Sequence, residues 1–207
     1  MEKMLVTQAL NELKLLDSRI TREINDAAFI VAAKTKETKV VPGVTKTDFI
    51  NSANAAYQSI KDLIDRRAKI KAAVVDSNSK TEVTINGVTM TVASAIEMKT
   101  SIDYQVKLCR TLKAQYENAM ATANRKNLDM EKAIDKYLET MVGADSKNNK
   151  DNFAEAVKPI RDANEYSLVD PLDVKTKADE LQKMIEGFRS EVDSVLQVSN
   201  CVTWIEF

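Results

Sequence analysis

The sequence predicts a mainly all-α protein: a bundle of long antiparallel helices, with a β-hairpin inserted at about 81–92 and a short C-terminal strand. Apolar residues recur at helical spacing along most of the chain. Only four Gly and three Pro interrupt the 207 residues, so turns are few and the elements must be long. Hydrophobic residues make up 44% and aromatic residues 5%, which indicates an aliphatic core in a single globular domain, residues 1–207.

A first helix is expected over about 3–33. Its apolar side chains follow one another in steps of three and four residues and form one continuous stripe. The sequence KTKETKVVPGVTKT comes next. Its Pro42–Gly43 pair predicts a turn, because Pro fixes φ at the first corner and Gly accepts a positive φ at the second.

A second helix is expected over about 48–77, with Thr47 as N-cap. Asp48 places a negative charge in the first turn, where it suits the helix dipole. Two helices of similar length joined by a turn predict an antiparallel helical hairpin. The apolar stripe of this second helix consists of Ile50, Ala53, Tyr57, Ile60 and Ile64, with Leu63 and Ile70 beside it.

The stretch TEVTINGVTMTV, at 81–92, is predicted to be a β-hairpin. Asn86–Gly87 favours a type I′ turn, because both residues tolerate a positive φ. Counting outward from the turn pairs Ile85 with Val88, and places apolar side chains on one face only. A two-stranded ribbon is marginally stable alone in water, so this face must be covered. We expect it to be an interaction surface, formed by Val83, Ile85, Val88 and Met90.

A third helix is expected over about 92–142. Its apolar stripe weakens near Asn124, so the sequence allows either one long helix or two helices with a bend. Gly143 suits the position that follows a helix, because Gly readily adopts the left-handed conformation. A short helix is expected next, over about 153–163, although Pro159 would disturb it.

A last helix is expected over about 171–198, with Asp170 as N-cap and Pro171 at the first helical position. Apolar residues from Val174 to Val195 follow in alternating steps of four and three. This is a heptad seam, typical of a coiled coil, and it needs a partner helix either in this chain or in another.

The tail CVTWIEF, at 201–207, is predicted to be a strand. Its aromatic residues, Trp204 and Phe207, would either dock on the body of the protein or contact a neighbouring chain. We expect the tail to pair with the hairpin or with a neighbouring copy. Together they would make a docking element, completed within the chain or by another subunit.

Charge is balanced overall but not locally. The formal net charge is −1, so nucleic acid is not an expected partner. Residues 34–80 hold ten basic and five acidic side chains, and residues 162–207 hold ten acidic and four basic ones. Such blocks either pack together, meet across a symmetric interface, or bind an acidic partner. Within the basic block, a cluster could contact an anion or simply form a solvated face with ion pairs: Arg66, Arg67, Lys69 and Lys71.

The chain contains no histidine, which removes the Ser-His-Asp and Cys-His catalytic systems and His-ligated zinc. Its four glycines cannot build a phosphate-binding loop, and it has no calcium-loop motif. We therefore expect no catalytic residues, no metal and no cofactor, and hence no enzyme. An enzyme built on clustered carboxylates is the remaining catalytic alternative. Cys109 and Cys201 are expected to stay reduced, and Cys109 falls in a helical core stripe.

No apolar run approaches the length needed to span a bilayer, and polar residues interrupt the apolar ones at the N-terminus. We therefore expect neither membrane insertion nor secretion by a signal peptide.

Five segments occur in a characteristic order: LVTQALNELKLLDSRI, RRAKIKAAVVDSNSKTEV, GVTMTVASAIEMK, VDPLDVKTKADELQKM and the terminal NCVTWIEF. In this order they resemble the septicolysin-like family of small helical proteins, found in bacteria and, in longer forms such as this one, in bacteriophages. The resemblance implies no catalytic residues. The long loop at KTKETKVVPGVTKT and the extension from Gly143 to Asn152 depart from the shorter members.

These observations predict a non-enzymatic structural or assembly protein. We expect a bacteriophage virion component that forms homo-oligomers and contacts other virion or host proteins, located in the virion or the host cytoplasm. The alternative is a phage-encoded binding module or regulator that captures a host protein or an anionic ligand through its basic segment.

Overall fold

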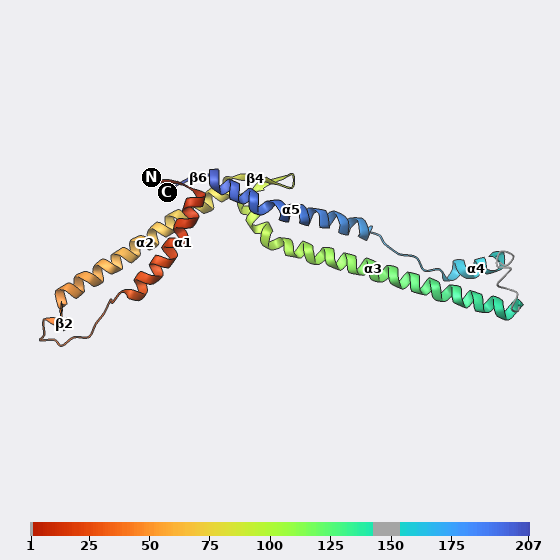
Figure 1. The fold of residues 1–207 in the computed structure, drawn as a ribbon, viewed down its shortest axis with the longest axis horizontal. Helices are drawn as coiled ribbons and strands as arrows, with labels where there is room; N and C mark the ends of the chain where they lie inside the picture. Colours follow the sequence, from red (N-terminus) through yellow and green to blue (C-terminus); the bar gives the residue numbers. More distant parts are fainter. Residues whose placement is uncertain (1, 143–153) are drawn as a thin grey trace. The chain divides into compact units, whose positions relative to one another are not determined.

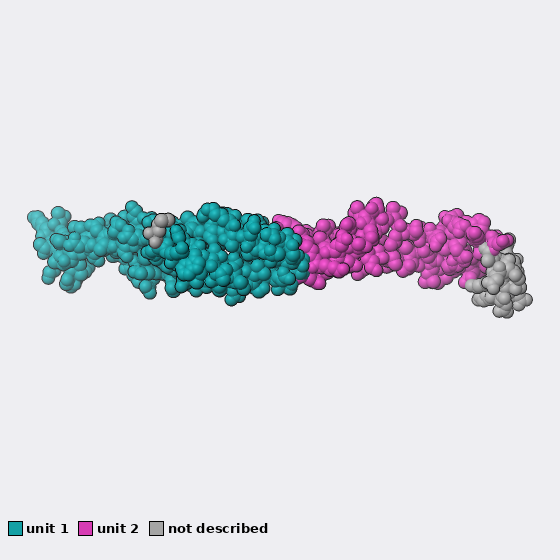
Figure 2. Space-filling model, turned by 90° about the horizontal axis from the view of Figure 1, so that it is seen from above, with its two compact units in different colours: residues 1–100, 187–207 teal, residues 101–186 magenta. Residues whose placement is uncertain are grey.

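The structure is a computed structural model and describes residues 2–142 and 154–207. It divides into two compact units (Figure 2): unit 1 is residues 1–100 with 187–207, and unit 2 is residues 101–186. Long helices dominate the described residues, which confirms the predicted fold class. The single-domain organisation stays a prediction.

The described strands pair as small antiparallel sheets of two strands each, in the combinations β1–β6, β2–β3 and β4–β5. In chain order the elements are β1 (Lys3–Leu5), α1 (Val6–Asp26), β2 (Lys39–Val41), β3 (Val44–Thr45), α2 (Lys46–Lys80), β4 (Glu82–Ile85), β5 (Val88–Thr91), α3 (Val92–Val142), α4 (Ala154–Asn164), α5 (Val174–Val202) and β6 (Trp204–Glu206).

In unit 1, α1 and α2 lie side by side (Figure 1) and form the antiparallel helical hairpin that the sequence predicts. Their direction follows from two contacts. Arg66 Nε binds Glu12 Oε1 at 2.6 Å, while Ser59 Oγ donates to Glu23 Oε2 at 3.0 Å, so residue numbers rise on one helix as they fall on the other. The core of the pair is aliphatic and consists of Val6, Ala9, Leu13, Leu16, Ile70, Val74 and Ile205.

The predicted first helix, 3–33, is wrong at both ends. Lys3–Leu5 is strand β1, and α1 ends at Asp26 with an extended residue after it. Helices in proteins are held mainly by packing of their apolar face, and beyond Asp26 that packing is lost: Ile30 is 90% exposed. Asp26 also places a negative charge at the helix C-terminus, where it opposes the dipole.

The second helix begins two residues earlier than predicted and ends three residues later. Its N-cap is Thr45 rather than Thr47, since Thr45 Oγ1 accepts the backbone N–H of Asp48 at 3.1 Å. The turn before it is the one predicted at Pro42–Gly43, with Gly43 at a φ of 88°. That turn joins β2 to β3, and places Thr45 at the end of a strand, where an N-cap has the extended backbone that it needs.

The β4–β5 hairpin has the predicted register, with Ile85 opposite Val88 and Val83 opposite Met90. Asn86 and Gly87 both have a positive φ, of 50° and 74°, as a type I′ turn requires.

The C-terminal tail does not pair with this hairpin, and that expectation was wrong. The strand is also shorter than the predicted 201–207, because α5 continues to Val202. β6 pairs instead with β1, in the register Met4 opposite Ile205. Glu2 and Phe207 extend the ladder by exchanging both backbone hydrogen bonds, at 3.0 and 3.1 Å. The two chain termini therefore lie together in unit 1 (Figure 1).

The third helix, α3, is continuous over the predicted range and does not break near Asn124. In unit 2, α4 (Ala154–Asn164) packs on it through a small apolar cluster of Ile134, Leu138 and Val157. Pro159 lies inside α4 without ending it. Gly143 and residue 153, the predicted start of this short helix, lie outside the described residues.

The last helix, α5, runs from Val174 to Val202 rather than over 171–198. Asp170 is not its N-cap, and Pro171 lies in a turn. The Asp170 carboxylate instead accepts the N–H of Leu172 at 3.2 Å and that of Val174 at 2.8 Å. Asp side chains commonly hold such a local turn in place of a helical one, which delays the helix start.

The heptad seam of α5 has its partner within the chain, on α3. In unit 2 the thiol of Cys109 donates to the carbonyl of Ala178 at 3.4 Å. In unit 1, Lys99 Nζ binds Asp193 Oδ1 at 2.5 Å. Seam residues of α5 are buried accordingly: Ala178, Ile185, Phe188 and Val192. Cys109 is a buried core residue with a free thiol, as predicted.

Candidate interaction surfaces

The apolar face of the hairpin is covered by α5, within unit 1. Val83 and Ile85 are buried, Met90 is half-buried, and Val88 is 57% exposed. On β4 this face is therefore covered by a helix of the same chain and not by the tail, while the role of the four residues as an interaction surface stays a prediction. Val88, on β5, keeps an apolar side chain at the surface.

The hairpin tip is fixed on α5 at a glycine. A Cβ placed on Gly187 would lie 2.5 Å from Cγ of Asn86, so the turn sits directly against the helix backbone. One helical turn later, Glu191 Oε2 accepts the backbone N–H of Asn86 at 2.6 Å. The close approach and the charged acceptor together hold the turn in place.

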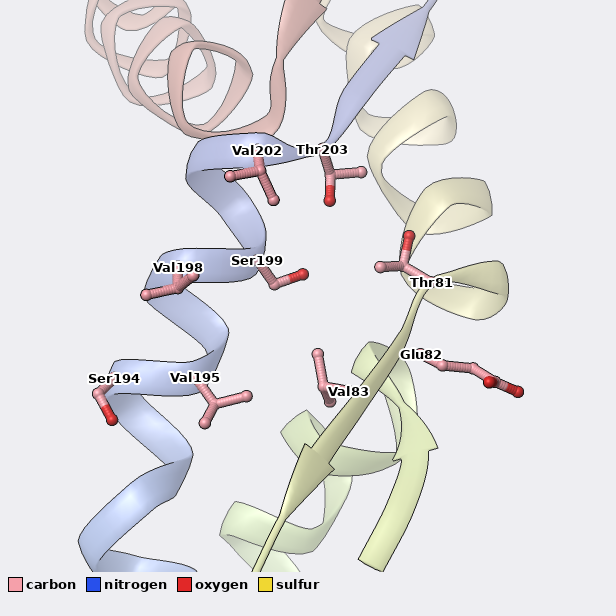
Figure 3. Close-up of a pocket in the computed structure, with 9 residues that line it drawn as sticks. All are labelled: Thr81, Glu82, Val83, Ser194, Val195, Val198, Ser199, Val202 and Thr203. Atoms are coloured by element: carbon pink, nitrogen blue, oxygen red, sulfur yellow. The ribbon is translucent and has the colours of Figure 1, made fainter.

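A groove of about 390 Å³ separates the base of the hairpin from the last turns of α5 (Figure 3). Figure 3 shows Val195 and Ser199 of α5 pointing across it toward Val83 of β4 and toward Thr81, which precedes β4. Its lining is mainly apolar and includes hydroxyl groups of Ser and Thr residues, and Val202, which also lines it, is 67% exposed. The groove has the size and lining of a site for an apolar side chain or a short peptide.

The tail residues proposed as interaction sites have different environments. Trp204 is 55% exposed on β6, while Phe207 is half-buried and packs on the α1–α2 core. The guanidinium of Arg66 lies over the Phe207 ring, 5.5 Å from its centroid. The same group binds the Glu2 carboxylate at 2.7 and 2.9 Å. Arg66 of α2 therefore contacts a residue near each end of the chain, Glu2 and Phe207.

Two members of the predicted basic cluster are engaged by carboxylates of unit 1. Arg66 binds Glu2 and Glu12, and Arg67 binds Asp17. The hydrogen bond from Arg66 holds the pKa of Glu2 below its usual value, and the one from Arg67 does the same for Asp17.

Lys69 and Lys71 are exposed. Lys69 lines a polar hollow together with Asp62, Asp65 and Glu2. Anion contact by the four basic residues, and with it the alternative function as a capture module, stays a prediction. Ion pairs offset part of the charge blocks: Glu12 and Asp17 of α1 bind arginines of the basic block, and Glu206 of the acidic block binds Lys3 at 2.9 Å.

Sequence reasoning missed one surface, which we name the α2 stripe. It consists of Ile50, Tyr57, Ile64 and Val75, which are 45–63% exposed, although the first three were expected to pack in the helical bundle. The ring of Phe29 meets that of Tyr57 edge to face, with centroids 6.5 Å apart, and extends the apolar surface beyond α2. A signal was present, because three of the members recur at intervals of seven residues, separately from the residues that face α1.

Unit 2 carries an apolar groove of its own, of about 490 Å³, between α3 and the start of α5. Leu172, one of the residues that line it, is 63% exposed. Its apolar lining consists of Leu108, Leu112, Leu172, Val174, Leu181 and Met184.

Comparison of the chain with family models, with curated proteins and with solved structures gives no match. The septicolysin-like resemblance therefore stays a prediction. Across residues 2–142 and 154–207, no helix is both long and apolar enough to cross a membrane. The same residues hold no group of three or more His, Cys, Asp or Glu side chains arranged to bind a metal ion.

Proposed function

We propose that this chain is a structural or assembly protein, without a catalytic role, that acts through contacts with further copies of itself and with other proteins of a bacteriophage particle. The virion or the host cytoplasm is then its location. The α2 stripe is the observation that carries this proposal. It is a line of large apolar side chains that stay exposed on a long helix whose buried residues, Ile60, Ile70 and Val74, lie outside the stripe.

Exposed apolar residues scattered singly are normal on a protein surface, whereas aligned ones mark an interaction site. The members of the stripe are aligned, and Phe29 adds to them. The grooves beside α5 offer further apolar contact area in each unit. An assembly protein needs several such surfaces, because it contacts more than one neighbour.

The assignment to a bacteriophage particle rests on the resemblance of the ordered sequence segments. The absence of a catalytic role is supported by composition, since a chain without histidine lacks the commonest general acid–base group.

Two measurements test the proposal. Light scattering coupled to size exclusion, over a concentration series, should show association of the purified chain. Mass spectrometry of purified phage particles whose genome encodes the chain should detect it among their proteins. A strict monomer at high concentration that is also missing from the particles would refute the proposal.

A further inference from the structure

The geometry of the α2 stripe points to one occupant: the same stripe of a second copy, packed antiparallel across a two-fold axis that passes between Asp62 and Leu63. We infer that the chain forms a homodimer through this contact. The inference rests on the proposed assembly function and names the partner that its clearest surface takes.

The stripe is straight and runs along one side of α2. At 3.6 residues per turn, its members fall within about 40° of one another around the helix. The α2 residues of the hairpin core lie well away from the stripe, Val74 by about 100° and Ile70 by about 140°, so α1 does not cover the stripe. A second helix can therefore lie along the stripe without displacing α1.

The stripe is complementary to itself when one copy is reversed. An axis between residues 62 and 63 places Ile50 opposite Val75 of the second copy, so apolar side chains meet at both ends. The same axis places Tyr57 opposite Ala68, an exposed alanine on the same side of α2, so the largest side chain meets the smallest. Two-fold interfaces have this property, because each contact occurs twice.

Charge favours the antiparallel arrangement over the parallel one. Lys61 lies on the same side of α2 as the stripe and is exposed. A parallel pair would bring Lys61 against Lys61 of the second copy, and like charges in contact are unfavourable. In the antiparallel pair Lys61 lies opposite Ile64 instead, with Asp65 of the second copy beside it, so its ammonium group reaches a carboxylate.

The size of the contact sets the strength of the dimer. From Ile50 to Val75 the stripe is about 37 Å long, and a helix presents a strip about 10 Å wide, so each copy contributes about 400 Å². A standard stable interface takes about 800 Å² from each partner. Phe29 enlarges the contact at Tyr57, but we expect a dimer that dissociates on dilution rather than a permanent one.

The first experiment measures this dimer by sedimentation velocity over a concentration series. The double variant Ile50→Glu, Val75→Glu should raise the dimer dissociation constant at least tenfold, because the two new carboxylates then face each other at both ends of the contact. Both side chains are exposed, so circular dichroism should show an unchanged fold. The matched control is Leu15→Glu, which adds the same charge at an exposed leucine on the far side of α1 and should leave the dissociation constant unchanged.

The second experiment tests the register. A Lys61→Cys chain and an Ile64→Cys chain of different mass, both carrying Cys201→Ser, are mixed and oxidised. The antiparallel dimer predicts mixed 61–64 disulfides well in excess of disulfides between identical chains. Disulfides mainly between identical chains would indicate a parallel pair and overturn the inference.

The failure of this inference is distinguishable from failure of the proposed function. If the chain associates but the double variant associates equally well, the stripe does not hold the second copy, and the assembly function stands. If the chain is a strict monomer yet is present in particles, the homodimer is wrong, and contacts with other proteins remain. A strict monomer that is also missing from particles would refute both the homodimer and the proposed assembly function.

Discussion

Asn86, in the turn of the β4–β5 hairpin, lies directly against Gly187 of α5. A Cβ at Gly187 would be 2.5 Å from Cγ of Asn86 and 2.6 Å from its Nδ2. A helix interior ordinarily disfavours Gly by about 1 kcal/mol relative to Ala. Here the absence of a side chain permits the contact, so the glycine positions the hairpin on the helix and thereby covers the apolar face of β4.

Gly187→Ala should lower the free energy of unfolding by about 1 kcal/mol, because the displaced turn costs more than the helix gains. Asn86→Gly should reverse the loss in that background, since it removes the clashing atoms and still accepts the positive φ of a type I′ turn. Urea unfolding of the four chains of this double-mutant cycle measures the coupling. A coupling energy near zero would show that the turn does not rest on the helix.

The hairpin could be predicted down to its register because its determinants are local. Asn86–Gly87 sets the turn, and the alternation of apolar and polar residues sets the faces. The partner of the tail could not be predicted in the same way. β1 and β6 lie at opposite ends of the chain, and Lys3–Leu5 carries the same apolar spacing as the helix that follows it. Only the long-range pairing makes that segment a strand.

The α2 stripe shows a second limit of sequence reasoning. Steps of three and four residues joined Ile60, which is buried, to Tyr57 and Ile64, which are exposed, in one predicted stripe. A helix with two apolar sides gives a broad pattern, and the sequence does not say which side the neighbouring helix covers. The basic cluster shows a third limit, because the acids that bind Arg66 and Arg67 lie on another element.

Ile205→Ala should lower the free energy of unfolding by about 3 kcal/mol, because Ile205 is only 3% exposed and belongs to the α1–α2 core. Trp204→Ala is the matched control, on the opposite face of the same strand. It should cost less than about 1 kcal/mol, since Trp204 is largely exposed. Chemical unfolding of both variants makes the comparison. Equal losses would show that β6 does not anchor the core.

Deleting 201–207 should destabilise unit 1 at least as much as Ile205→Ala.

The ion pairs of Arg66 and Arg67 predict a loss of stability in acid. The pKa values of Glu2 and Asp17 are lowered in the folded chain from usual values of 4.5 and 3.8, mainly by hydrogen bonds from these guanidinium groups. A lowered folded pKa means that the unfolded chain takes up protons first as the pH falls. The stabilisation is therefore complete above about pH 4.5 and is lost progressively below it.

Arg66→Met should lower the melting temperature at pH 7 and lower it less at pH 3, where Glu2 is largely protonated in the unfolded chain and the ion pair therefore contributes less to stability. Lys69→Met is the control on the same helix and removes one positive charge near the same acids. Thermal unfolding followed by circular dichroism at both pH values makes the measurement. If the effect of Arg66→Met does not change with pH, its role is packing on Phe207 rather than ion pairing.

In unit 2, the amide of Asn127 on α3 holds the chain after α4 at Tyr166. Asn127 Nδ2 donates to the carbonyl of Tyr166 at 2.9 Å, and the N–H of Tyr166 donates to Asn127 Oδ1 at 2.8 Å. The ammonium group of Lys126 lies 5.9 Å from the centroid of the Tyr166 ring. One side chain thus completes both backbone hydrogen bonds of a residue outside any helix or strand, which orders the connection between α4 and α5.

Asn127→Ala should cost about 1 kcal/mol and speed hydrogen exchange at the Tyr166 amide, because both bonds are lost. Asn127→Asp should retain most of the exchange protection, since a carboxylate still accepts that N–H but cannot donate to the carbonyl. Asn124→Ala, at an exposed position one turn earlier, is the control and should leave exchange unchanged. Equal exchange rates in all three variants would mean that the connection is ordered by its other contacts, and that the paired amide hydrogen bonds contribute little.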